Sequence, residues 1–172
     1  MTEAEFWDLI EKTKRSEPFE HVDRLVPRLV KLPVQEILSF GFWWSEAETA
    51  AYVWNLWGAG YLINSGCSDD GFIDFRSWLI LKGEKVYRNA VQTPDSLAGV
   101  RVEPDEAECE CYPAAIAYAK AVTDSEHAEY YIELIANHSL TVREDPLGEH
   151  WDFESKTEMI RRLPKLWKKF GY

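Results

Sequence analysis

The residues of this chain that are best suited to binding or catalysis form a short polar stretch, GCSDDGF, at residues 66–72. It places two adjacent carboxylates, Asp69 and Asp70, directly after the thiol of Cys67 and the hydroxyl of Ser68. Neighbouring carboxylates can hold a cation or serve as general bases. The two carboxylates follow twenty uncharged residues, 49–68, a pattern typical of a buried helix that ends in a polar loop.

Helix capping explains the same residue types without any binding. Ser68 or Asp70 can accept a hydrogen bond from a backbone N–H at the start of a following helix, and acidic residues in a first helical turn interact favourably with the helix dipole. A calcium-binding loop with Gly71 as its central glycine would need a glutamate where the chain has Ser77. We therefore predict no metal site and no cofactor.

Further polar and aromatic residues accompany this loop. Arg76 interrupts an apolar run and is expected either to pair with the loop carboxylates or to hold an anion. Asn64 lies in the uncharged run, where a buried amide needs hydrogen-bond partners, and aromatic residues at helical spacing form either core or pocket walls. The candidate binding residues are Trp57, Tyr61, Asn64, Cys67, Ser68, Asp69, Asp70, Arg76 and Trp78.

Cys67 could act as a nucleophile only with a base beside it. None of the four histidines lies near it in the sequence, although a spatial pair would serve equally well. A small buried thiol is the simpler interpretation.

Helical periodicity dominates the chain that must position these residues. We predict a mainly α fold, a single compact helical domain over residues 1–172 around a central helix-loop-helix, with at most one or two short strands at 100–103 and 140–143. The predicted helices cover 3–15, 20–32, a segment from Pro33 that ends near 41–45, 46–64, 72–81, 84–91, 105–122, 123–135 and 156–170.

Composition limits the classes of function. The net charge of −11 argues against nucleic-acid binding, which relies on Lys and Arg. Residues 156–172 carry a net charge of +5, so this tail is expected either to dock on the acidic remainder or to recruit an acidic partner. Three cysteines without framework spacing and an acidic amino terminus favour a cytoplasmic protein, and the polar and glycine residues within 49–68 argue against a membrane span.

The block WNLWGAGYLINSGCSDDGFIDFRSWLILKG at residues 54–83 resembles the core signature of bacterial domain-of-unknown-function family 4240. The segments EFWDLIEKTK, LPVQEILSF and LPKLWKKF, together with Glu-Cys-Glu at 108–110, are similar to the flanking parts of that family. The resemblance implies a small soluble bacterial protein with a mainly helical domain and no assigned activity. Residues 121–153 depart from the family pattern, and we interpret them as a variable, insertion-like segment.

These observations favour a binding or protein-interaction module whose site is the loop at 66–71 and whose partner is an unknown small molecule or protein. Two alternatives remain. A small hydrolase-like enzyme would use Asp69 or Asp70 as a general base or metal ligand, and an immunity-type partner protein would need a broad acidic face. A pocket that reaches the two carboxylates would favour the enzyme.

Overall fold

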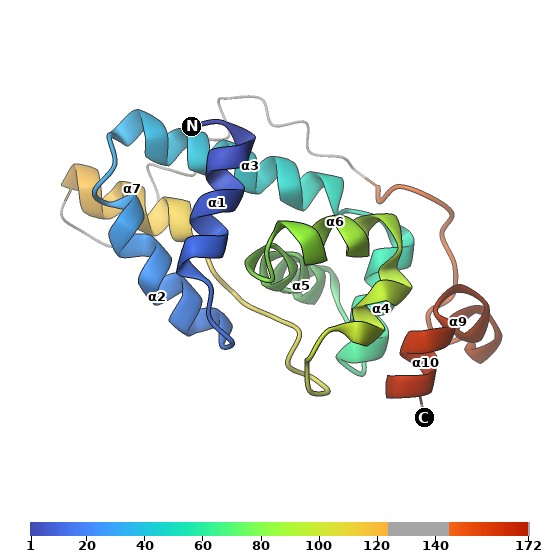
Figure 1. Cartoon of the computed structure of the whole chain (residues 1–172). Helices are drawn as coiled ribbons and strands as arrows, with labels where there is room; N and C mark the ends of the chain where they lie inside the picture. The colour runs from blue at the N-terminus through green and yellow to red at the C-terminus, as the bar shows by residue number, and fades with distance from the viewer. Residues whose placement is uncertain (124–144, 172) are drawn as a thin grey trace. The chain divides into compact units, whose positions relative to one another are not determined.

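The structure is a computed structural model that describes residues 1–123 and 145–171. Within these residues it contains nine α-helices, one 3₁₀-helix and no strand (Figure 1). The prediction of a mainly α fold is confirmed. Contacts divide the described chain into a first unit, Met1–Thr49 with residues 111–123, and a second unit, Ala50–Glu110 with residues 145–171. The single domain over 1–172 stays a prediction.

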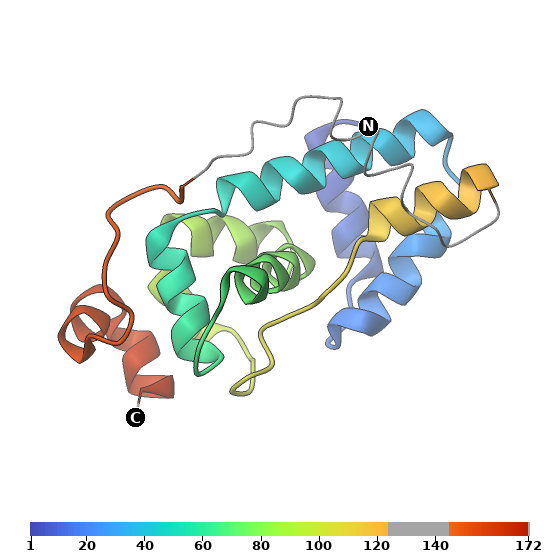
Figure 2. The ribbon, with the colours of Figure 1, turned by 180° about the vertical axis from the view of Figure 1, so that it is seen from behind.

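The first unit consists of four helices that bury their apolar faces against one another. A capping box starts its first helix, because the Thr2 hydroxyl accepts a hydrogen bond from the Glu5 N–H and the Glu5 carboxylate accepts one from the Thr2 N–H. Figure 2 shows α7 lying beside α2. The helices are α1 (Glu3–Thr13), α2 (Pro18–Leu29), α3 (Val34–Ala50) and α7 (Pro113–Thr123).

The second unit contains all the candidate site residues. Its centre is the predicted helix-loop-helix, in which α4 packs against α5 with Trp57 stacked on Phe72. Its helices are α4 (Trp54–Ile63), α5 (Asp69–Leu81), α6 (Glu84–Gln92), the 3₁₀-helix η1 (Pro94–Gly99), α9 (Lys156–Arg162) and α10 (Pro164–Phe170). Among the residues that the structure describes, no helix combines the length and the apolar character that a membrane span needs.

The predicted helix over 46–64 is wrong, because the chain breaks between α3 and α4. Helix α3 continues past the expected end at 41–45 and reaches Ala50. The chain then pairs with Leu147, whose N–H donates to the Tyr52 carbonyl (2.8 Å) and whose carbonyl accepts from the Trp54 N–H (3.0 Å). A backbone pairing with a distant segment therefore overrides the local helical preference.

The predicted helix over 105–122 is wrong in its first half, because α7 begins only at Pro113. The preceding residues run beside α4 and α5, where the Asp105 N–H donates to the Ile63 carbonyl (3.1 Å) and the Cys109 N–H to the Asp74 carbonyl (3.0 Å). Glu106, Glu108 and Glu110 are exposed whereas Ala107, Cys109 and Cys111 are buried, the alternation of an extended chain. The strand predicted at 100–103 is also wrong, since those residues form no strand.

The basic tail folds as two short helices instead of the predicted single helix over 156–170, because Pro164 separates α9 from α10. Leu163 gives α10 no side-chain cap. Asp95 of η1 replaces it, accepting hydrogen bonds from the backbone N–H groups of Lys165 (2.9 Å) and Leu166 (2.9 Å). Helix α10 thus docks on η1 and α4, as expected for the tail.

Two further predictions, the helix at 123–135 and the strand at 140–143, lie outside the described residues. The interpretation of 121–153 as an insertion-like segment falls largely on the same part of the chain.

Candidate functional site

The loop between α4 and α5 is shorter than predicted. It turns at Ser65 and Gly66, which both have positive φ (53° and 137°), and the Gly66 N–H donates to the Tyr61 carbonyl (2.9 Å). A φ of 137° strains any residue with a side chain, which explains the glycine. Helix α5 already begins at Asp69, so Asp69 and Asp70 belong to a first helical turn.

Ser68 is the N-cap of α5, and its hydroxyl accepts a hydrogen bond from the Gly71 N–H (3.1 Å). Asp69 and Asp70 follow it as exposed side chains in the turn where the helix dipole favours negative charge. Of the two residues that could cap this helix, Ser68 and Asp70, Ser68 is the N-cap. The two carboxylates stay available at the surface.

Asn64 joins the end of α4 to the extended segment. Its amide nitrogen donates to the Ala107 carbonyl (3.1 Å), and its amide oxygen accepts from the Ala107 N–H (3.0 Å). This pair of hydrogen bonds satisfies the half-buried amide as a neighbouring strand would. Asn64 therefore holds the segment that carries Glu108 and Glu110 against the helix-loop-helix.

Cys67 is a half-buried residue of the same loop, and its carbonyl accepts a hydrogen bond from the Trp57 indole N–H (3.0 Å). Burial, followed by the negative charge of Glu108, raises the pKa of the Cys67 thiol to about 12, although Trp57 opposes the shift. Only a thiolate is a competent nucleophile. The structure therefore supports the buried thiol and not the nucleophile.

A row of stacked side chains supports the loop. Trp57 lies between Trp54 (centroids 5.4 Å apart, planes at 5°) and Phe72 (4.8 Å, 10°). The row ends in a cation, because the Arg76 guanidinium lies 5.1 Å from the Phe72 centroid and 5.0 Å from that of Tyr52. Each such aromatic pair contributes about 0.5–1.5 kcal/mol beyond its buried area. The pairing of Arg76 with the loop carboxylates stays a prediction.

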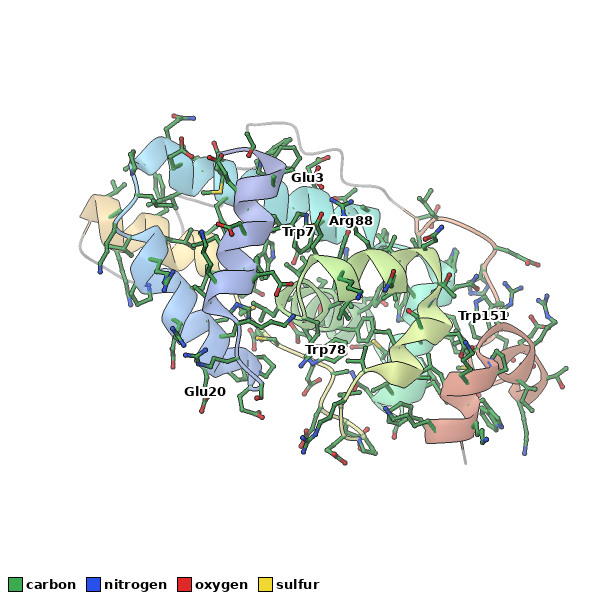
Figure 3. The ribbon with its side chains drawn as sticks, in the orientation of Figure 1. Glu3, Trp7, Glu20, Trp78, Arg88 and Trp151 are labelled. Carbon is green, nitrogen blue, oxygen red and sulfur yellow. The ribbon has the colours of Figure 1, made fainter. Side chains whose placement is uncertain are left out.

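Trp78, labelled in Figure 3, belongs to the core of the second unit, and Phe75 connects it to this row by stacking on Phe72 with centroids 6.0 Å apart. Its side chain is only 1% exposed, and it stacks on Phe75 with centroids 5.5 Å apart. Lys82 covers the ring, with its Nζ 4.8 Å from the centroid. The structure therefore gives Trp78 a packing role and offers no open wall there.

The carboxylates of α5 belong to a larger acidic group that the sequence did not reveal. The hydrogen bond from Cys109 to Asp74 brings the extended segment to α5, with the exposed Glu108 and Glu110 on either side of Cys109. Burial raises the pKa of Asp74, and the charges of Glu110, Glu108 and Asp70 raise it further. We call this surface the acidic face; its residues are Asp70, Asp74, Glu108 and Glu110.

The alternation of glutamate with small residues at 106–111 was the available sequence signal for the acidic face. The alanine content of the same region suggested a helix and concealed it. In the described part of the chain, no three His, Cys, Asp or Glu side chains are grouped as metal ligands would be. The acidic face thus presents dispersed charges at a surface.

A family model described as a protein of unknown function, DUF4240, matches residues 1–124. The chain belongs to the DUF4240 family. No curated protein and no solved structure matches it. The resemblance carried by the block at 54–83 is confirmed, and the DUF4240 match contains every predicted site residue and the whole acidic face.

Two of the cavities among the described residues of the second unit lie away from Asp69 and Asp70. The larger, of about 350 Å³, is bounded by α4, residues 153–154 and the helices α9 and α10, most of which lie beyond the DUF4240 match. The smaller, of about 280 Å³, is lined by residues 101–104 with Lys169 and Phe170. Tyr61 is the one predicted site residue that lines either of these two, and neither reaches Asp69 or Asp70. The general-base role of these carboxylates gains no support from them.

Proposed function

We propose that this DUF4240 protein is an interaction module whose acidic face binds a cationic segment of a protein partner. The observation that carries the proposal is the hydrogen bond from the Cys109 N–H to the Asp74 carbonyl (3.0 Å), because it brings two acidic stretches far apart in the sequence to one surface. The two hydrogen bonds between the Asn64 amide and the Ala107 backbone hold the second stretch in place. The two backbone segments that carry the carboxylates are therefore held together by these hydrogen bonds.

Electrostatics favours a partner of opposite charge. Carboxylates close enough to raise the pKa of Asp74 repel one another, and an approaching Lys or Arg side chain would relieve that repulsion. Charged groups at an interface accelerate encounter and exclude partners of like charge. The net charge of −11 adds a long-range attraction for cations.

The proposal keeps two of the sequence-based hypotheses and weakens the third. An interaction module and an immunity-type partner would both use a broad acidic face against a basic surface. A hydrolase would need its general base in a site that closes around a substrate, and Asp69 and Asp70 are exposed. The acidic face, with the loop residues at one end of it, is the surface that supports binding.

The test uses a labelled octa-arginine peptide as a cationic probe and fluorescence anisotropy as the measurement. The face variant combines Asp70→Asn, Asp74→Asn, Glu108→Gln and Glu110→Gln. The control variant removes the same charge from exposed carboxylates of the first unit, by the substitutions Glu17→Gln, Glu20→Gln, Asp23→Asn and Glu46→Gln. Circular dichroism confirms that both variants fold.

The face variant is expected to bind the peptide about tenfold more weakly, because four charge pairs at the surface, at a few tenths of a kcal/mol each, amount to about 1.4 kcal/mol. The control variant should lose much less, and binding should weaken with salt. Equal losses in the two variants would mean that the peptide senses only net charge. That result would refute the acidic face as a site.

A further inference from the structure

The cavity of about 350 Å³ in the second unit has an apolar floor and a charged mouth. Buried Leu62 and Met159 form the floor. Half-buried Tyr61, Phe153 and Trp167 form the walls, and exposed Glu154 and Lys156 lie at the mouth. Apolar lining with a few convergent polar groups is the usual composition of a small-molecule site.

The aromatic walls are held in place by their own contacts. Phe153 lies 5.5 Å from Tyr61 between ring centroids, and Trp151 packs edge-on against it at 4.8 Å. Trp167 is carried by α10, whose first turn is fixed by the side chain of Asp95. A flat ring entering the cavity would therefore meet rigid aromatic faces.

The mouth presents two opposite charges that are not paired with each other or with another described residue. Lys156 has its Nζ 5.4 Å from the Trp167 centroid, which places the ammonium at the cavity wall. Neither this ammonium nor the Glu154 carboxylate has an ion-pair partner among the described residues. An ammonium and a carboxylate that line the same cavity match a ligand that carries one charge of each sign.

We propose that this cavity binds a small zwitterion with an aromatic side chain, of the class of the aromatic α-amino acids. The ring lies between Tyr61, Phe153 and Trp167, Lys156 binds the ligand carboxylate, and Glu154 binds the ligand ammonium. The volume of about 350 Å³ is at the lower end of the range of about 300–1,000 Å³ for ligand sites, which suits a single amino acid. No residue of this cavity belongs to the acidic face, so the two proposals stand or fall separately.

The test measures binding to the full chain by isothermal titration calorimetry with four probes. L-tryptophan carries both charges, tryptamine lacks the carboxylate, indole-3-propionate lacks the ammonium, and glycine lacks the ring. The variants are Lys156→Met and Glu154→Gln, with Lys168→Met as a control that removes an exposed lysine of α10 outside the cavity lining. All three positions are exposed, so folding should be preserved.

Wild type should bind L-tryptophan most tightly and glycine undetectably. Lys156→Met should weaken L-tryptophan and indole-3-propionate about tenfold while leaving tryptamine unchanged, because one charge-assisted hydrogen bond is lost. Glu154→Gln should weaken L-tryptophan and tryptamine and leave indole-3-propionate unchanged. This crossed pattern distinguishes direct contact from a general disturbance of the cavity.

Three results would overturn the assignment. The first is the absence of saturable binding of L-tryptophan to wild type at millimolar concentrations. The second is a loss in Lys168→Met as large as that in Lys156→Met. The third is equal affinity for L-tryptophan and for the two singly charged probes, which would remove the roles given to Lys156 and Glu154.

Discussion

Replacing Gly58 by alanine should destabilise the second unit, although the same change usually stabilises a helix. A Cβ atom on Gly58 would lie well inside van der Waals contact of Trp151 Cζ2, 2.7 Å from its Cη2 and 3.3 Å from its Cε2. Carbon atoms in contact are normally separated by about 3.5–4.0 Å. Trp151 is 5% exposed and is confined by Phe153 and by the Arg162 guanidinium, 5.2 Å from its ring centroid (Figure 3).

The size of the effect follows from two opposing contributions. Alanine gains about 1 kcal/mol over glycine in helix propensity. Overpacking a filled core costs about 1–3 kcal/mol, and an indole that moves outwards also loses part of the roughly 1.5–3 kcal/mol that burial of a large apolar side chain provides. We therefore expect the free energy of unfolding to fall by about 2 kcal/mol, or Tm by roughly 4–8 °C.

Urea denaturation followed by circular dichroism measures this change. The matched control is Gly71→Ala, also in a helix, where the nearest atoms to the new Cβ would be Ser68 Oγ at 3.4 Å and Cys67 Sγ at 3.7 Å. These are ordinary contacts, so this variant should gain up to about 1 kcal/mol. Opposite signs for two identical substitutions would show that the neighbour decides the outcome.

A second variant tests the cause directly. Trp151→Phe shortens the ring that blocks Gly58, and the Trp151 indole N–H has no hydrogen-bond acceptor among the described residues, so no hydrogen bond is broken. The Gly58→Ala, Trp151→Phe double variant should lose clearly less than the sum of the single changes. An unchanged stability in Gly58→Ala, or strict additivity in the double variant, would refute the reasoning.

Three further predictions concern charged and polar groups of the second unit. Asp95→Ala should lower the free energy of unfolding by about 1–2 kcal/mol and speed tryptic cleavage in α10, because the backbone N–H groups of Lys165 and Leu166 lose their acceptor. Asp95→Asn should lose less stability, and an unchanged rate of cleavage in Asp95→Ala would contradict the prediction. Asp74→Asn should be more stable than wild type at pH 7 in urea titrations, by up to about 1 kcal/mol, because a raised carboxyl pKa means that the folded state disfavours the charge. This gain in stability should shrink as the pH falls through the raised pKa towards 3.8, and a gain that does not change with pH would contradict the prediction. Cys67, with its pKa raised from 9.0 to about 12, should hold about a thousandfold less thiolate at pH 8 than an unperturbed thiol. Mass spectrometry should therefore show that iodoacetamide labels Cys67 slowly in the folded protein and rapidly in urea, and rapid labelling without urea would contradict the raised pKa.

Local signals in the sequence were sufficient for the helices whose ends are set by nearby residues. The helix predicted over 3–15 begins where α1 begins, at a start that the capping box of Thr2 and Glu5 fixes. The Ser68 cap and the apolar run after it predicted α5, although its first turn was assigned to the loop. In each case the groups that satisfy the helix end lie within four residues of one another.

The elements that the sequence did not predict are set by distant partners. Leu147 pairs with the backbone on either side of Val53 and separates α3 from α4. The Asn64 side chain accepts the hydrogen bond that the Ala107 N–H would make to a backbone carbonyl in a helix. Asp95 supplies the cap that Leu163 cannot give α10. Periodicity and propensity contain no information about such partners.

The predicted binding site stays a prediction, and the sequence named only a few residues of the two proposed surfaces, among them Asp70 and Tyr61. Helical spacing correctly grouped aromatic residues near the loop, but it could not show which of them a neighbour would cover. Trp78 is enclosed by the core, whereas Tyr61 opens onto a cavity formed with Phe153. The difference depends on where residues 145–171 dock.

Trp57 connects the helix that carries Asp74 with the wall of the cavity, because it stacks on Phe72 of α5 and also contacts Phe153, with ring centroids 4.8 Å and 6.1 Å away. The two surfaces nevertheless depend on different parts of the chain. The acidic face needs Asn64 and the extended segment, all within the residues that match the family. The cavity needs α10 to be docked, since Trp167 forms one of its walls. Loss of the Asp95 cap should therefore weaken binding of an aromatic amino acid while binding of a cationic peptide persists, because only the cavity loses a wall.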